Sequence, residues 1–192
     1  TCALPIYSVW TGWYENGIQK SKEYYSNGKR TGTWQYFTNK GIPESKGTFK
    51  NDLQDGSFVE YYSSGKIHTE GEYVKGKKSS AWKTYFENGS IEEEITFDGD
   101  VRLMKNLWLK DGKQIIANGN GTLITEYHTG KIKSKGDYKD GLMSGPWQYF
   151  TKSGAKDFTV NYESGKKNGL CTNYFENGKT KSEGNYKNDK KD

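Results

Sequence analysis

The side chains that most often carry out chemistry are few in this sequence, and they do not converge. His68 and His128 stand at different positions of the repeat described below. Neither has a Cys or Asp at the spacing of a metal site or a catalytic triad, so an exposed strand or turn histidine is the simpler interpretation of both. A search for a nucleophile, a base and oxyanion donors finds no candidates. We therefore predict that the protein is not an enzyme.

The densest acidic run is Glu92-Glu93-Glu94. In a strand, alternate side chains point to opposite faces, so Glu92 and Glu94 would share one side. A pair of carboxylates is the machinery of a glycoside hydrolase, but nothing else converges on this pair, and a solvated edge is the better interpretation. Two further segments, 98–100 and 118–121, resemble calcium loops yet lack the ligand count and are better interpreted as turns. We predict no metal and no cofactor.

The two cysteines, Cys2 and Cys171, show neither metal spacing nor a disulfide framework. Cys2 stands near the start, where bacterial lipoproteins carry an acylated cysteine, which favours a secreted or cell-envelope location over a cytoplasmic one. Cys171 occupies a position that tryptophan holds in other parts of the repeat, so we expect a buried small apolar side chain. No stretch approaches the roughly 20 apolar residues of a membrane-spanning helix.

The composition predicts a folded chain with a thin, aromatic core. Only 31% of the 192 residues are apolar, a value typical of disorder, but 15% are aromatic, and disordered chains are poor in aromatic residues. The net charge is +5, with basic and acidic residues interleaved throughout the chain. Because no long block of one sign occurs, nucleic acid is not the expected partner.

Glycines recur at a fixed period and organise the whole sequence. We call them anchor glycines, and successive ones lie 24 residues apart in two series: Gly17, Gly41, Gly65 and Gly89, then Gly130, Gly154 and Gly178, with Gly112 as an off-period copy. Such a period is the signature of repeats in which one unit cannot bury its apolar side alone. We predict one repeat array over residues 1–192, with about eight copies of a two-strand unit.

Aromatic residues keep fixed positions around each anchor glycine and predict short strands bounded by turns. Turn dipeptides such as Asn16-Gly17 and Asn27-Gly28 separate these strands. The predicted fold is all-β, an elongated antiparallel meander of tandem β-hairpins forming an open twisted sheet. A glycine six residues after the anchor, as at Gly71, predicts close approach of a neighbouring aromatic ring. The structural repeat aromatics are Trp34, Phe58, Tyr61, Tyr73, Trp82, Tyr138, Trp147 and Tyr162.

The period breaks over residues 98–121, where the chain is also most apolar. One interpretation is a degenerate repeat that repacks its own core. The alternative is a partner-binding patch, because an insertion that exposes apolar side chains tends to bind something. The candidate patch consists of Leu103, Met104, Leu107, Trp108, Ile115 and Ile116.

The sequence resembles the variant MORN repeat (MORN_2 type) of bacterial proteins similar to the YwqK-like antitoxins. Two segments match it closely, 136–141 and 145–150, and so do 71–76 and 82–89. The resemblance implies a non-catalytic scaffold that binds a protein partner, and the antitoxin label implies a partner toxin. The resemblance does not identify individual binding residues, because the repeat motif is structural.

Two other partner classes stay open. The Gly12-Trp13-Tyr14 and Tyr24-Tyr25 segments are similar to choline-binding wall repeats, which favours a cell-wall or carbohydrate ligand held in an aromatic cage. Lysine-rich turns such as 75–78 favour a membrane-surface adaptor, although interleaved acids weaken that idea.

Overall fold

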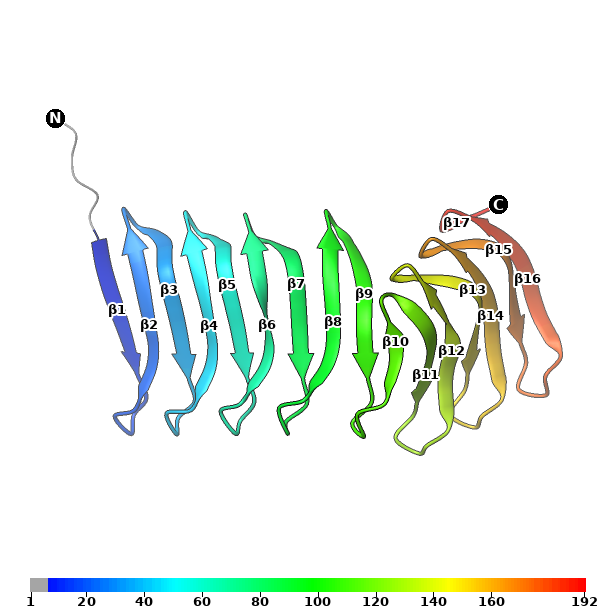
Figure 1. Ribbon diagram of the computed structural model, residues 1–192, viewed down its shortest axis with the longest axis horizontal. Coiled ribbons are helices and arrows are strands. Elements are labelled where there is room, and N and C mark those ends of the chain that lie inside the picture. Colours follow the sequence, from blue (N-terminus) through cyan, green and yellow to red (C-terminus); the bar gives the residue numbers. More distant parts are fainter. Residues whose placement is uncertain (1–6) are drawn as a thin grey trace. The chain divides into compact units, whose positions relative to one another are not determined.

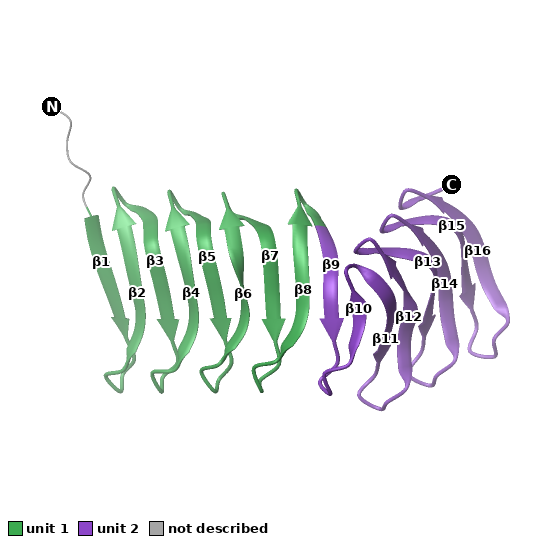
Figure 2. Ribbon diagram, in the orientation of Figure 1, with its two compact units in different colours: residues 1–101 green, residues 102–192 purple. Residues whose placement is uncertain are grey.

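The computed structural model describes residues 7–192, and all regular structure in that range is β-strand (Figure 1). The chain forms two compact units, residues 1–101 and residues 102–192 (Figure 2). The boundary between them falls inside residues 98–121, where the sequence period breaks. One continuous array over residues 1–192 remains a prediction.

The strands of the N-terminal unit are β1 (Tyr7–Trp13), β2 (Gln19–Ser26), β3 (Lys29–Phe37), β4 (Pro43–Lys50), β5 (Leu53–Tyr61), β6 (Ile67–Val74), β7 (Lys77–Tyr85) and β8 (Ile91–Asp98). At the unit boundary begins β9 (Val101–Trp108). The C-terminal unit continues with β10 (Gln114–Ala117), β11 (Asn120–Glu126), β12 (Ile132–Lys139), β13 (Leu142–Phe150), β14 (Lys156–Glu163), β15 (Lys166–Tyr174), β16 (Thr180–Lys187) and β17 (Lys190–Lys191).

Each unit is an antiparallel meander in which a strand pairs with its neighbours in the sequence. Pairing runs without a break from β1 to β8 in one unit and from β9 to β17 in the other. Neither meander closes on itself over the described residues. The prediction of an all-β, open meander of tandem hairpins is confirmed.

The turns follow from residues that accept positive φ. The anchor glycines Gly17, Gly89 and Gly178 have φ of 79°, 93° and 80°, a region that L side chains rarely adopt. At the opposite end of the hairpins, Asp52 takes the glycine position with φ of 71°. Its carboxylate Oδ1 accepts the Arg30 backbone N–H at 2.8 Å, 22 residues earlier, so this side chain joins two successive repeats.

The core of each unit contains buried indole rings together with aliphatic side chains. Trp34, Trp82 and Trp147 are 5%, 2% and 3% exposed. Tyr73 meets Trp82 edge-on at 5.1 Å between ring centroids, and Tyr138 meets Trp147 in the same way at 5.7 Å. Edge-to-face pairs are a favoured arrangement of aromatic rings, so the few apolar residues of this chain form a well-packed core.

Two of the buried rings, those of Trp82 and Trp147, lie directly over a glycine of the preceding strand. A Cβ at Gly71 would stand 2.2 Å from Cδ2 of Trp82, and one at Gly136 would stand 2.1 Å from Cδ2 of Trp147. The indole N–H then donates to the next carbonyl along the strand, Glu72 O or Asp137 O, each at 3.2 Å. The predicted approach of a ring to a glycine six residues after the anchor is confirmed at Gly71 and Gly136 and is wrong at Gly184, where a Cβ would meet no atom within 4 Å.

Candidate functional site in the degenerate repeat

The irregular repeat of the C-terminal unit results from two shortened strands. β10 has four residues, whereas β2, β4, β6, β8, β12, β14 and β16, which hold its place in other copies, have eight. β11 has seven residues, whereas β3, β5, β7, β13 and β15 have nine. The hairpin therefore loses half of one strand, on the side of the anchor glycine Gly112.

The remaining end of this hairpin is held closely. The Asn118-Gly119 turn donates from Gly119 N to Lys105 O at 2.7 Å, and Gly141 N donates to Gly119 O at 2.9 Å. The Asn106 Oδ1 accepts both the Asn118 backbone N–H and the Gln114 amide, each at 3.0 Å. A Cβ at Gly121 would stand 2.2 Å from Ile115 O, so the shortened strands approach each other too closely there for any side chain.

The structure divides the six predicted patch residues between core and surface. Met104 and Ile116 are 3% and 0% exposed, and they lie in the core. The other four are half-buried: Leu103, Leu107, Trp108 and Ile115. Repacking of the core accounts for Met104 and Ile116, while a partner-binding role for the other four remains a prediction.

Beside this patch lies an open aliphatic groove of about 720 Å³. Leu109 and Ile124 are 42% and 43% exposed. The full lining, which we call the β11 groove, is Leu109, Lys113, Gln114, Ile115, Thr122, Ile124 and Glu126. Its size is that of a ligand-binding cleft, and its lining combines three aliphatic with four polar side chains.

Sequence reasoning found only Ile115 among the groove residues. Leu109 stands three residues before its anchor glycine, where Tyr14, Tyr62 and Tyr127 stand in other copies. Those tyrosines donate their hydroxyls to Phe37 O, Tyr85 O and Phe150 O of the following copy, at 2.8, 2.6 and 2.7 Å. Leucine has no hydroxyl to donate. Because other copies have Thr38, Phe86, Thr151 or Phe175 at this position, the sequence alone did not distinguish Leu109 as a groove residue.

The titratable residues singled out from the sequence do not form a reaction centre. His68 Nδ1 lies 3.8 Å from Glu60 Oε2, and its ring lies 4.5 Å from that of Tyr62. Burial raises the pKa of Glu92, with a smaller contribution from Glu93. Glu94 forms an ion pair with Lys83 at 3.4 Å. Within residues 7–192, no cluster of three or more His, Cys, Asp or Glu side chains could hold a metal ion.

The strongest resolved pKa shifts belong to tyrosines of the repeat. Burial and a 2.6 Å hydrogen bond from the Tyr85 hydroxyl to Glu70 Oε1 raise the pKa of Tyr85 to about 12. Burial, followed by the contact with Tyr162, raises the pKa of Tyr149. Both hydroxyls are therefore kept protonated, which suits a structural role and makes neither group a base.

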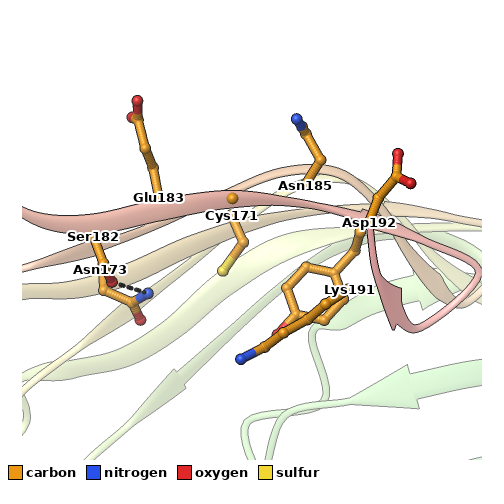
Figure 3. A pocket seen from close by; sticks show the side chains of 9 residues that line it. Cys171, Asn173, Ser182, Glu183, Asn185, Lys191 and Asp192 are labelled. Atoms are coloured by element: carbon orange, nitrogen blue, oxygen red, sulfur yellow. Dashed lines mark hydrogen bonds between the residues drawn. The ribbon is translucent and has the colours of Figure 1, made fainter.

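Cys171 is half-buried, with a free thiol, rather than fully buried as expected. It pairs with Val160 on one side and with Gly184 on the other. A Cβ at Gly184 would meet no atom within 4 Å, in contrast to the glycines that lie under rings. Figure 3 shows the resulting hollow, with Cys171, Asn173 and Ser182 on one side of the sheet and Glu183 on the other. Cys2 lies outside the described residues.

Of the aromatic residues considered for a choline cage, Tyr14 and Tyr25 make contacts within the repeat fold. The Tyr25 ring packs on Trp34 at 5.1 Å, and the Tyr14 hydroxyl is bonded to Phe37 O. Lys20 and Lys22 lie over the Tyr14 and Tyr24 rings at 5.7 and 5.6 Å, where a ligand cation would compete with them. Trp13 is 62% exposed.

Comparison with known families gives one match, repeated along the chain. The family is described as MORN repeat variant, and its matches together span more than half of the chain, at residues 30–51, 54–75, 80–98, 119–140 and 167–188. No curated protein matches the sequence. Within residues 7–192 no helix is long and apolar enough to cross a membrane.

Proposed function

Because the chain belongs to the MORN repeat variant family, a non-catalytic type of repeat that generally serves in binding, we propose that it is a scaffold that binds a protein partner. The observation that carries this proposal is the β11 groove. Three aliphatic side chains, Leu109, Ile115 and Ile124, line a hollow where the repeat pattern is broken. Exposed apolar surface of this kind is typical of interaction sites.

The rest of the fold supports the same function. The strands that flank the groove belong to a hydrogen-bonded meander, so little conformational entropy is lost when a partner binds to them. The core aromatics are already in contact with one another, so their rings are not available to a partner. The half-buried Leu107 and Trp108 adjoin Leu109 in the sequence and would extend the contact.

The direct test is capture of a partner from a lysate and envelope fraction of the source organism by the immobilised full chain. The matched variant carries Leu109→Asp and Ile124→Asp, which place charge in the groove. The control carries Val74→Asp, at a residue that is 50% exposed in the N-terminal unit. We expect one stoichiometric protein to be retained by the parent and the control and lost by the groove variant, with unchanged circular dichroism for all three.

Retention of that protein by the groove variant would contradict the placement of the binding site in the β11 groove. Absence of a protein, together with quenching of tryptophan fluorescence by choline or a glycan, would contradict the proposal in favour of a wall ligand. Salt-sensitive sedimentation with anionic vesicles would instead favour a membrane surface.

An antitoxin or immunity role is the finer form of this proposal, and it rests on the resemblance alone. It requires the captured partner to be toxic on its own. Expression of that partner with and without this chain is the test: growth restored by the parent chain and not by the groove variant supports the role. Equal growth of strains that express the partner alone, with the parent chain and with the groove variant would contradict the antitoxin role.

A further inference from the structure

The β11 groove lies along a stretch of sheet edge inside the C-terminal unit. In other copies, the residues five and six before the anchor glycine pair with the preceding strand. Before Gly41, for example, Tyr36 pairs with Ser21 and Gln35 pairs with Lys22. The equivalent pairs in two further copies are Thr69↔Thr84 and Glu70↔Lys83, and Ser134↔Tyr149 and Lys135↔Gln148. The corresponding residues of β11 are Ile124 and Thr125. β11 pairs with β10 only through Gly121 and Asn120.

The cause is the missing half of β10. The ladder between β10 and β11 ends at Ile116↔Gly121. Before Ile116, the chain pairs with β9 at Gln114↔Trp108 and has no paired residue on β11. On its other side, β11 keeps a full ladder with β12 from Gly121 to Glu126. Leu123, Ile124 and Thr125 thus have a strand on one side only, as do residues 180–185 of β16 at the end of the meander.

An open edge has a chemical preference that an ordinary apolar patch lacks. In an antiparallel strand, alternate residues direct their N–H and C=O groups to opposite sides, so part of the main chain of residues 123–125 points into the open side. Only another extended main chain offers both donors and acceptors at the spacing of the ladder. The exposed Ile124 and Leu109 add a surface for one apolar side chain of that segment.

We propose that the edge of β11 at residues 123–125 accepts an extended peptide segment of the partner protein as an added antiparallel strand, with an aliphatic side chain opposite Ile124 in the β11 groove. The added segment takes the place of the four residues that β10 lacks. Recognition of this type obtains affinity from main-chain hydrogen bonds and specificity from the side-chain groove. The proposal rests on the proposed protein-binding function and names the form of its ligand.

The pairings elsewhere in the chain set the side-chain pattern of the segment. The residue opposite the position of Thr125 is small and hydroxylated in four copies, at Ser21, Ser45, Thr69 and Ser134, and it is Phe158 in a fifth. We therefore expect a Ser or Thr opposite Thr125 and, as its neighbour, the aliphatic residue opposite Ile124. In the same four copies that neighbour is Lys22, Lys46, Glu70 or Lys135, and in the fifth it is Thr159, so an apolar residue there would be particular to this groove.

The experiment uses phage-displayed random octapeptides selected on the full chain, followed by binding of the selected synthetic peptide in solution. Three variants separate the edge from the surface. The first inserts Lys-Ile-His-Thr, the residues that follow Gly65, directly after Gly112, which restores an eight-residue β10 in the chain itself. The second is Ile124→Lys. The control is Ile132→Lys, at a residue that is 38% exposed and outside the groove.

We expect selected peptides to carry an aliphatic residue beside Ser or Thr. Their dissociation constant should rise at least tenfold for the insertion and for Ile124→Lys, and less than twofold for Ile132→Lys. N-methylation of alternate peptide amides should weaken binding in one register and leave the other unchanged, because only alternate N–H groups face β11.

Selected peptides that bind the insertion variant as well as the parent, or that tolerate N-methylation in both registers, would overturn the proposal. Failure to select any peptide would overturn it as well. Capture of a folded protein partner in that case would leave the protein-binding function standing without strand addition, so the two failures are distinguishable.

Discussion

The strand pairs β6–β7 and β14–β15 meet in different ways at the same position of the repeat. In β6–β7 the bulky Trp82 lies over Gly71, as Trp147 lies over Gly136 in β12–β13, and in β14–β15 the small Cys171 pairs with Val160. Trp82 and Val160 are both 2% exposed, so each arrangement produces a buried centre. These two strand pairs therefore follow a volume rule, in which a ring over a glycine and two smaller side chains fill the same space.

The largest expected effect comes from adding a side chain under a ring. Gly71→Ala places Cβ 2.2 Å from a buried indole that has no room to move, and we expect a loss of about 3 kcal/mol in the free energy of unfolding. Gly184→Ala is the matched control, because its Cβ would meet no atom within 4 Å. Urea unfolding of the two variants should separate them clearly, and equal stability would contradict the packing of the ring on the glycine.

The volume rule has a stricter test in a double mutant. Trp82→Cys alone should cost about 3 kcal/mol through the cavity it leaves, and Gly71→Val alone should cost at least as much through overlap. The combination copies the Val160 and Cys171 pair, so we expect it to be less destabilised than the sum by roughly 1–3 kcal/mol. A double-mutant cycle from chemical unfolding measures this coupling. Additive losses would show that the two arrangements are not alternatives at one position.

A smaller effect is expected at Ser80, which has φ of 58°. The same position is glycine at Gly32, Gly56, Gly145 and Gly169, with φ of 64°, 114°, 69° and 94°. Ser80→Gly should therefore stabilise the N-terminal unit by about 0.5–1 kcal/mol, since the strain of positive φ exceeds the entropy that glycine loses on folding. The thermal midpoint of Ser80→Gly against that of Ser79→Gly, at a neighbour without positive φ, gives the comparison. An unchanged midpoint would contradict the strain.

The smallest effect is a pH dependence in alkaline solution. The pKa of Tyr85 is raised to about 12 from an ordinary value of 10, so the folded state holds this proton more tightly than the unfolded state. The stabilisation is complete below pH 10 and is lost as the pH rises through 12. Tyr85→Phe should flatten the decline of stability between pH 10 and 12. An unchanged slope would show that other tyrosines are responsible.

Much of the fold could be predicted from residue spacing, because a repeat imposes the same turn and the same ring on every copy. Gly71 under Trp82 is an example, since a strand glycine at a fixed distance from a tryptophan indicates that the ring lies over it. The degenerate repeat was different. The spacing from Gly112 to Gly130 showed that residues were missing, but not that β10 lost four of them and β11 two.

The candidate site could be predicted only in part for the same reason. Met104, Ile116 and Ile115 all belong to one apolar cluster in the sequence, yet only Ile115 lines the β11 groove. Hydrophobicity alone does not distinguish a repacked core from an exposed patch. Ile124 was missed because its exposure depends on the absence of a paired strand beside it. That absence follows from the register between β10 and β11, which the sequence pattern does not reveal.

The most direct test of the open edge compares amide hydrogen exchange at equivalent residues of the two units. Gln35 and Tyr36 have strands on both sides, whereas Ile124 and Thr125 have one on a single side. We predict slow exchange at both amides of the first pair, and fast exchange at one amide of the second pair that becomes slow when the selected peptide is added. Equal protection of all four amides in the free protein would contradict the open edge, and with it the form of binding proposed for this chain.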